Sequence, residues 1–262
     1  MTPDIENSKF YTDSIYSKNL SEYRKHNIYL PKGFNCKNKY SIIYATDGNL
    51  DSNANYMKSL LDSLINAKLI KPTIYVGSYS NSKLTNEYQT KGNGEKSYHS
   101  YRHFEYIETQ YDSTNHDKKL ASRFKNHLDY FTSEFIPHIE RSLKIKASKK
   151  DRLFYGVSNG AGFGANLLNK HPNLIENYIC FSTLGSNATS NIWNKNIKYP
   201  NLYLKYGDEE SFVLKIMTDQ IIEKYKSVNS FYDIEKYKGG HNAKSWNKKL
   251  EETLIKILNV EQ

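Results

Sequence analysis

The sequence predicts an α/β fold, with a mostly parallel central sheet flanked by helices on both faces. Short runs of apolar, β-branched and aromatic residues alternate with amphipathic stretches, which is typical of repeated β–α–β units. The chain has 262 residues, of which 38% are hydrophobic and 25% are charged. This length suits one large α/β domain. We see no internal repeat and no domain boundary, so we expect residues 1–262 to form a single domain.

Periodicity gives the order of the elements. Strands are expected where short apolar runs occur, at residues 27–30, 40–45, 72–78, 151–157, 179–183, 201–206 and 230–237. Helices are expected where apolar residues recur every three or four positions, at residues 54–69, 118–143, 161–170, 212–225 and 245–258. Pro137 is expected to kink or split the second of these helices, because its ring clashes with the preceding turn.

Residues 81–117 are polar and contain Gly92 and Gly94. We expect a long loop here, forming a lid-like insertion at about residues 80–117. Loops of this length in a compact domain are usually functional.

Bulk properties limit the class of protein. The chain has no run of 18 apolar residues, so no membrane span is expected. Residues 1–20 carry charges throughout and lack the apolar core of a signal peptide. The location is therefore left open: cytoplasmic, or secreted or periplasmic if a leader has been removed. Oligomeric state is equally open.

The net charge of +9 has two interpretations. It reflects either a well-solvated, lysine-rich surface or the attraction of an anionic substrate. The lysines form no dense tract, so we do not expect a nucleic-acid partner. The two cysteines, Cys36 and Cys180, form no CxxC pair. We expect two buried thiols, with a disulfide between them as the alternative. No metal site is predicted.

The central motif is Gly156-Val157-Ser158-Asn159-Gly160, a GxSxG sequence. It follows an apolar strand and precedes a helix that begins with small residues, which is the strand–turn–helix setting of a nucleophile elbow. The helix N-terminus places free N–H groups near a developing oxyanion. The alternative is a glycine-rich turn that contains a serine without a catalytic role.

A nucleophilic serine needs a base, and His241 is the best placed of the eight histidines. It follows two glycines, between the last expected strand and the last expected helix. The third member of a triad should be a carboxylate between Ser158 and His241. Asp208, Glu209 and Glu210 all follow the strand at 201–206. The spacing favours Glu210, with Asp208 as the alternative; helix N-terminal charge is the competing role for this acidic run.

An oxyanion hole needs a second backbone N–H besides that of Asn159. The strand that ends at Thr46 runs into Asp47-Gly48-Asn49, and Gly48 permits a sharp turn. We expect the N–H of Asn49 to be the second donor. An ordinary turn is the alternative.

These features resemble the putative-esterase branch of the α/β hydrolases, which includes enterochelin and other siderophore esterases, feruloyl and acetylxylan esterases, S-formylglutathione hydrolase and mycolyltransferases. The matching pieces are Asp47-Gly48, the Gly156–Gly160 elbow, the strand that ends in Gly207 with its acids, and Gly240-His241. Arg102-His103-Phe104-Glu105-Tyr106 is similar to the Arg-x-x-Glu-Tyr segment of siderophore esterases.

The resemblance implies an α/β-hydrolase fold and a serine carboxylic-ester hydrolase that acts on a small-molecule ester through an acyl-enzyme, with no metal or organic cofactor. It also implies that Arg102 and Tyr106 bind substrate. A siderophore-type or other anionic ester is the first hypothesis; a feruloyl or acetylxylan ester is the second, and a thioester the third. Acyl transfer to another acceptor uses the same triad. From another class, a catalytically silent binding protein on this scaffold is the alternative.

Overall fold

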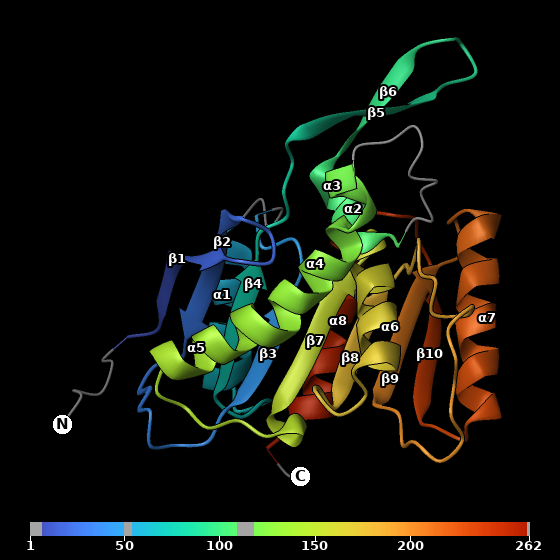
Figure 1. Ribbon diagram of the computed structural model, residues 1–262. Helices are drawn as coiled ribbons and strands as arrows, with labels where there is room; N and C mark the ends of the chain where they lie inside the picture. Colours follow the sequence, from blue (N-terminus) through green and yellow to red (C-terminus); the bar gives the residue numbers. More distant parts are fainter. Residues whose placement is uncertain (1–6, 50–53, 109–117, 261–262) are drawn as a thin grey trace.

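The computed structural model describes residues 7–49, 54–108 and 118–260. Its centre is an eight-stranded sheet with the order β1-β2-β4-β3-β7-β8-β9-β10. Strand β2 runs antiparallel to both of its neighbours, whereas the strands from β4 to β10 in this order are parallel. The mostly parallel sheet flanked by helices that the sequence predicts is therefore confirmed (Figure 1).

The strands of this sheet are β1 Lys9–Ser17, β2 Glu22–Leu30, β3 Ser41–Ala45, β4 Thr73–Ser78, β7 Arg152–Val157, β8 Asn177–Phe181, β9 Asn201–Gly207 and β10 Tyr232–Tyr237. A separate hairpin is formed by β5 Leu84–Thr90 and β6 Lys96–Ser100. The α-helices are α1 Ala54–Asn66, α2 Tyr101–Tyr106, α3 Lys118–Ala121, α4 Arg123–Asp129, α5 Ile136–Ser142, α6 Asn159–Lys170, α7 Phe212–Ser227 and α8 Ala243–Leu258. A π-helical turn spans Tyr130–Phe135 and a 3₁₀ turn spans Lys149–Asp151.

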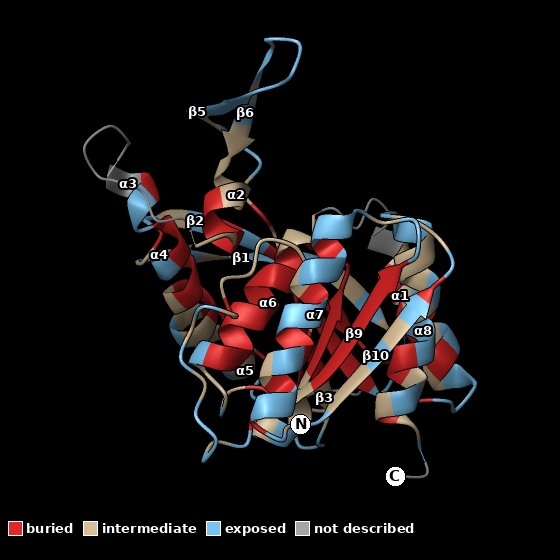
Figure 2. Ribbon diagram, turned by 90° about the vertical axis from the view of Figure 1, so that its right-hand side faces the viewer, coloured by how far each residue is buried: buried red, intermediate tan, exposed pale blue. Residues whose placement is uncertain are grey.

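Helices cover both faces of the sheet, because alternate residues of each strand point to opposite sides. In β3, Ile42 and Tyr44 pack with residues of α4, α5, α6 and α7, whereas Ile43 and Ala45 pack with residues of α1 and α8. Figure 1 shows α1 and α8 behind the sheet and α4 to α6 in front of it. Figure 2 shows that the middle strands are buried between these layers. Because the strands from β4 to β10 are parallel, their carboxyl ends lie at one edge of the sheet. The loops that follow these ends are the usual place for a binding or catalytic site in such folds.

The sequence did not indicate β1 or the first half of β2. Strand β1 lies at the edge of the sheet, and Ser17 is its only buried residue. A strand that buries so little of either face needs no apolar alternation, and the polar sequence of β1 therefore carries no strand signal.

The segment expected as a loop at 81–117 contains the β5–β6 hairpin and α2, while residues 109–117 lie outside the described part of the chain. The hairpin projects from the body of the molecule (Figures 1 and 2). Tyr88 and Tyr98 are paired across it with ring centroids 5.6 Å apart. Because no face of the hairpin packs on the core, its strands lack the apolar pattern by which strands are recognised in a sequence.

The long helix expected at 118–143 is divided into α3, α4, the π-helical turn and α5. Pro137 is the second residue of α5. The π-helical turn directly before it accommodates the ring, which would otherwise clash with the carbonyl four residues earlier. The helical backbone is continuous from Arg123 to Ser142, so Pro137 does not split it, and the irregularity is the π-helical turn that precedes α5.

No disulfide joins Cys36 to Cys180, and the latter is fully buried whereas Cys36 is half-buried. Within the three described ranges, none of the helices combines the length and apolar character that crossing a bilayer requires.

A buried ion cluster ties α2 to the rest of the domain. Glu105 of α2 is 0% exposed. Its carboxylate accepts hydrogen bonds from Arg24 of β2 at 2.7 and 3.0 Å. It also accepts from Arg123 of α4 at 2.6 and 3.1 Å. Both guanidinium groups bond to Glu22 as well. The cluster fixes the base of the projecting hairpin relative to the sheet.

The Glu105→Gln substitution should lower the free energy of unfolding by about 3–5 kcal/mol. It removes the buried negative charge with which the guanidinium groups of Arg24 and Arg123 pair. Urea denaturation measures the change. Glu95→Gln is the matched control, since Glu95 pairs with Lys91 on the exposed hairpin, and such pairs contribute less than about 1 kcal/mol. Equal losses in the two variants would show that the cluster does not anchor α2.

His127 of α4 is 1% exposed, and burial, reinforced by Arg24 and Arg123, lowers its pKa well below the usual value. The unfolded chain takes up a proton on this side chain near pH 6.5, whereas the folded protein does not. The unfolded state thus binds more protons below that pH, so stability should fall as the solution is acidified. In His127→Gln, unfolding free energies measured from pH 6.5 to 5 should fall less steeply, by up to about 1.4 kcal/mol per pH unit. An unchanged slope would contradict this assignment.

Candidate active site

The turn between β7 and α6 holds Ser158 in a strained backbone conformation. Strand β7 ends at Val157, and Ser158 has φ 55° and ψ −127° before α6 begins at Asn159. Residues other than glycine rarely adopt a positive φ, and they keep it only where the surrounding structure enforces it. This sharp turn is the geometry expected of a nucleophile elbow.

The two glycines of the motif make the turn possible. A Cβ on Gly156 would lie 2.7 Å from the backbone carbon of Gly160. A Cβ on Gly160 would lie 2.4 Å from Oγ1 of Thr46, at the end of β3. Strand β7, helix α6 and the loop after β3 therefore approach one another more closely than any other residue would allow.

The structure brings Ser158, His241 and Glu210 into one hydrogen-bonded chain. Nε2 of His241 lies 3.0 Å from Oγ of Ser158, and Nδ1 lies 2.9 Å from Oε2 of Glu210. An ionised carboxylate only accepts hydrogen bonds, so Nδ1 carries the proton and Nε2 presents its lone pair to the serine hydroxyl. This arrangement can remove the hydroxyl proton as the oxygen attacks a carbonyl carbon.

The surroundings of Glu210 keep it ionised. Burial alone would raise its pKa, but hydrogen bonds from His241, Ser182 and the N–H of Gly207 outweigh burial and hold the pKa below its ordinary value. The side chain of Glu210 is 1% exposed and that of His241 is 38% exposed. The carboxylate is thus shielded while the imidazole stays open to an incoming molecule.

The other two acids of the run have different positions. The carboxylate of Asp208 accepts a 2.9 Å hydrogen bond from the N–H of Gly239, in the loop that carries His241. Glu209 donates its backbone N–H to the carbonyl of Gly239 at 3.1 Å, and its side chain is exposed. Both residues therefore fasten the loop after β9 to the loop after β10, and Glu210 alone of the three contacts the imidazole.

Close packing of these two loops depends on Gly207. A Cβ there would lie 2.0 Å from the carbonyl oxygen of Gly239. This contact sets the separation at which the acid of one loop reaches the histidine of the other.

Two support residues were missed by the sequence analysis. Oγ of Ser182, which follows β8, donates to Oε1 of Glu210 and accepts a 2.7 Å hydrogen bond from Nε1 of Trp246. The ring of Trp246 meets that of His241 edge to face, with centroids 4.8 Å apart. A serine after a strand and a tryptophan in a helix carry no signal of their own, and only their position beside the acid reveals them.

The expected oxyanion donors lie on the turn and on the neighbouring loop. Asn159 is the first residue of α6, so its N–H is one of those that a helix leaves without an intrahelical acceptor. Asn49 follows Gly48, and its side-chain Oδ1 accepts from the N–H and the hydroxyl of Ser80. This side-chain anchor, together with the bond from Gly48 N–H to the carbonyl of Ser78 at 2.9 Å, holds the loop after β3.

Arg102 and Tyr106, which were expected to bind substrate, both contact Asp47 in the structure. Arg102 donates to both carboxylate oxygens of Asp47, at 2.6 and 2.8 Å, and lies 3.5 Å from Oδ1 of Asn159. Tyr106 is 1% exposed, and its hydroxyl lies 3.3 Å from both the N–H and the carboxylate of Asp47. Since Asp47 has a φ of 59°, these contacts hold a strained residue directly before Gly48 and Asn49.

The model of the family described as putative esterase matches residues 17–257. A ferulic acid esterase superposes with a TM-score of 0.73 at 17% identity, over 96% of this chain and 98% of that chain. The enterochelin esterase of Shigella flexneri gives 0.69 at 12% identity, over 98% of this chain and 59% of that one. An IroE-like serine hydrolase from Shewanella oneidensis gives 0.68 at 17% identity, over 94% and 79%. No curated protein sequence matches the chain.

Substitution of Glu210 and of Asp208 should have different effects on ester hydrolysis. Glu210→Gln should lower kcat/KM for an ester by about 10²–10⁴-fold, because the amide cannot stabilise a protonated imidazole. Asp208→Asn should have a smaller effect, since its contact is to a backbone N–H that an amide oxygen can still accept. Steady-state kinetics on the two variants gives the ranking. The reverse ranking would transfer the role of the acid to Asp208.

Proposed function

The chain belongs to the putative esterase family, and on this premise we propose that it hydrolyses a carboxylic ester by means of Ser158, His241 and Glu210. The observation that supports this proposal most directly is the unbroken set of contacts from Ser158 Oγ to His241 Nε2 and from His241 Nδ1 to Glu210. Nucleophile, base and orienting acid come from three loops at one edge of the sheet.

In the first step, Oγ of Ser158 attacks the ester carbonyl while Nε2 of His241 takes the hydroxyl proton. Glu210 stabilises the imidazolium that results and keeps its ring in place. The proton then passes to the leaving alkoxide, the carbon–oxygen bond of the ester breaks, and an acyl-enzyme remains on Ser158.

The negative charge that develops on the carbonyl oxygen needs donors that are already in position. We assign this role to the backbone N–H groups of Asn159 and Asn49. The N–H of Asn159 is held in place because this residue begins α6. The loop that carries Asn49 is held by the ion pair between Asp47 and Arg102. A lost oxyanion donor typically costs about 3–4 kcal/mol of barrier.

In the second step, water replaces the alcohol. His241 removes a proton from the water molecule, which attacks the acyl carbon. The bond between that carbon and Oγ then breaks, and His241 returns the proton to Oγ of Ser158 as the acid leaves. Acyl transfer to another acceptor, or cleavage of a thioester, would use the same groups.

The class of ester that the protein hydrolyses can be found by comparing turnover of several esters. The hypothesis of a siderophore-type ester rested on Arg102, Tyr106 and the net charge; Arg102 is paired with Asp47 and Tyr106 is buried. The net charge of +9 is the support that remains for an anionic ester. Since the similar structures include both ferulic acid and enterochelin esterases, feruloyl esters, acetyl esters and siderophore trilactones belong in one panel.

Ser158→Ala should abolish both labelling by a fluorophosphonate probe and hydrolysis of p-nitrophenyl acetate and butyrate, with a loss of about 10⁴-fold or more, because no other group attacks the carbonyl. Ser227→Ala is the matched control: this exposed serine lies at the C-terminal end of α7, and its hydroxyl bonds to a backbone carbonyl. It should behave as wild type. Circular dichroism checks that both variants fold.

Retained turnover in Ser158→Ala would overturn the assignment of the nucleophile. Absence of labelling and of turnover in the folded wild-type protein would instead favour a binding protein on this scaffold.

A further inference from the structure

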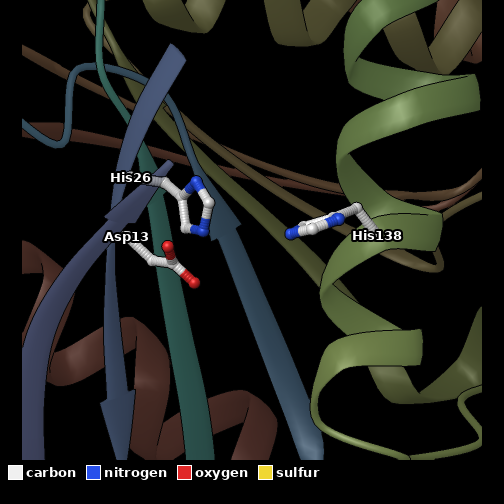
Figure 3. A group of neighbouring side chains, drawn as sticks. All are labelled: Asp13, His26 and His138. Carbon is white, nitrogen blue, oxygen red and sulfur yellow. The ribbon is translucent and has the colours of Figure 1, made fainter. Parts of the chain in front are cut away.

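A group of three side chains far from Ser158 has the composition of a metal site, which the sequence did not predict. Asp13 lies on β1, His26 on β2 and His138 on α5. One potential ligand atom from each lies within 4.8 Å of the other two. Figure 3 shows the carboxylate of Asp13 beside the His26 ring, and the His138 ring reaching towards them from the helix.

The fold itself produces this juxtaposition. Asp13 and His26 are direct partners in the antiparallel register of β1 and β2, so their side chains share one face of the sheet. The same face of β1 carries Ser17, which bonds to Glu134 in the π-helical turn just before α5. Helix α5 is thereby held above the hairpin, with the ring centroids of His138 and His26 6.1 Å apart.

His26 is the second and independent sign of a ligand. Its residue is 0% exposed, and neither ring nitrogen has a hydrogen-bond partner. A buried polar group left without a partner destabilises the folded state, and such groups call for an explanation. The neighbouring ring of Phe135, 5.5 Å away between centroids, offers no acceptor. A metal ion would satisfy one of these nitrogens.

We propose that Asp13, His26 and His138 bind a divalent first-row transition-metal ion, with zinc as the foremost candidate. Two imidazoles and one carboxylate are ligands that suit Zn²⁺, which also accepts water in its remaining position. Asp13 is exposed and His138 is half-buried, so the ion enters from solvent. On binding, these two side chains would rotate to bring their ligand atoms to the bond lengths of about 2.0–2.2 Å that zinc requires.

The site would stabilise the protein and take no part in ester hydrolysis. In the sheet order, β4 and β3 separate the β1–β2 pair from β7, which leads to Ser158. An ion held by both strands and by α5 would fasten the edge of the sheet to the helix layer. Because the ion binds the folded arrangement, its affinity should appear as added stability.

The test uses the full chain, freed of metal with a chelator and titrated with ZnCl₂ by calorimetry. One equivalent should bind, and zinc should raise the melting temperature. His138→Gln and Asp13→Asn should each weaken binding by at least about 10–100-fold, the loss that outer-shell partners alone already cause. These two residues are chosen because neither is fully buried, so folding should survive.

His171→Gln and His99→Gln are the controls. His171 is a half-buried histidine at the end of α6, and His99 stacks on His103 in the one other close histidine pair among the ring contacts of the described residues. Both variants should bind zinc as wild type does, and ester turnover should be the same in all four variants. Failure of the wild-type protein to bind zinc, or unchanged binding in His138→Gln, would overturn the proposal. Loss of binding in His99→Gln instead would place the ion on the hairpin.

Discussion

The left-handed backbone at Ser158 is the constraint on which the candidate site depends. With φ at 55°, the chain reverses within one residue and exposes the serine between the end of β7 and the start of α6. This reversal is possible because Gly156 and Gly160 let α6 and the loop after β3 approach without a Cβ between them. The turn that presents Ser158 therefore also brings the strained residue Asp47, and the loop of the proposed second oxyanion donor, against the helix N-terminus.

Support for that loop comes from a segment remote in sequence. Arg102 and Tyr106 hold Asp47, and Glu105, between them in α2, is held in turn by Arg24 and Arg123. A single short helix thus connects the buried ion cluster to the loop after β3. Its sequence pattern is similar to that of siderophore esterases, and the side chains of Glu105 and Tyr106 are buried. The direction of its side chains depends on the ion pairs of Glu105 with Arg24 of β2 and Arg123 of α4.

The sequence revealed those features that carry a local signal. Apolar strands between amphipathic helices predicted the parallel sheet, and the glycines around Ser158 and before His241 marked the two turns. Strand β1 and the β5–β6 hairpin left no such signal, because neither buries a continuous apolar face. Asp13, His26 and His138 could not be associated at all, since strand register and a helix seated on the sheet bring them together. Long-range packing of this kind is absent from any window of sequence.

Only one of the three consecutive acids after β9 contacts the imidazole of His241. Asp208, Glu209 and Glu210 are consecutive, so no argument from charge or composition separates them. The contact between Gly207 and the carbonyl of Gly239 sets the distance between the two loops, and the N–H of Gly207 then bonds to Glu210 at 2.9 Å. With this bond and Ser182 fixing one oxygen of Glu210, the other faces His241. Asp208, two residues earlier, accepts a hydrogen bond from a backbone N–H instead. Backbone spacing at a glycine, rather than the acidity of any side chain, therefore selects the carboxylate that orients the imidazole.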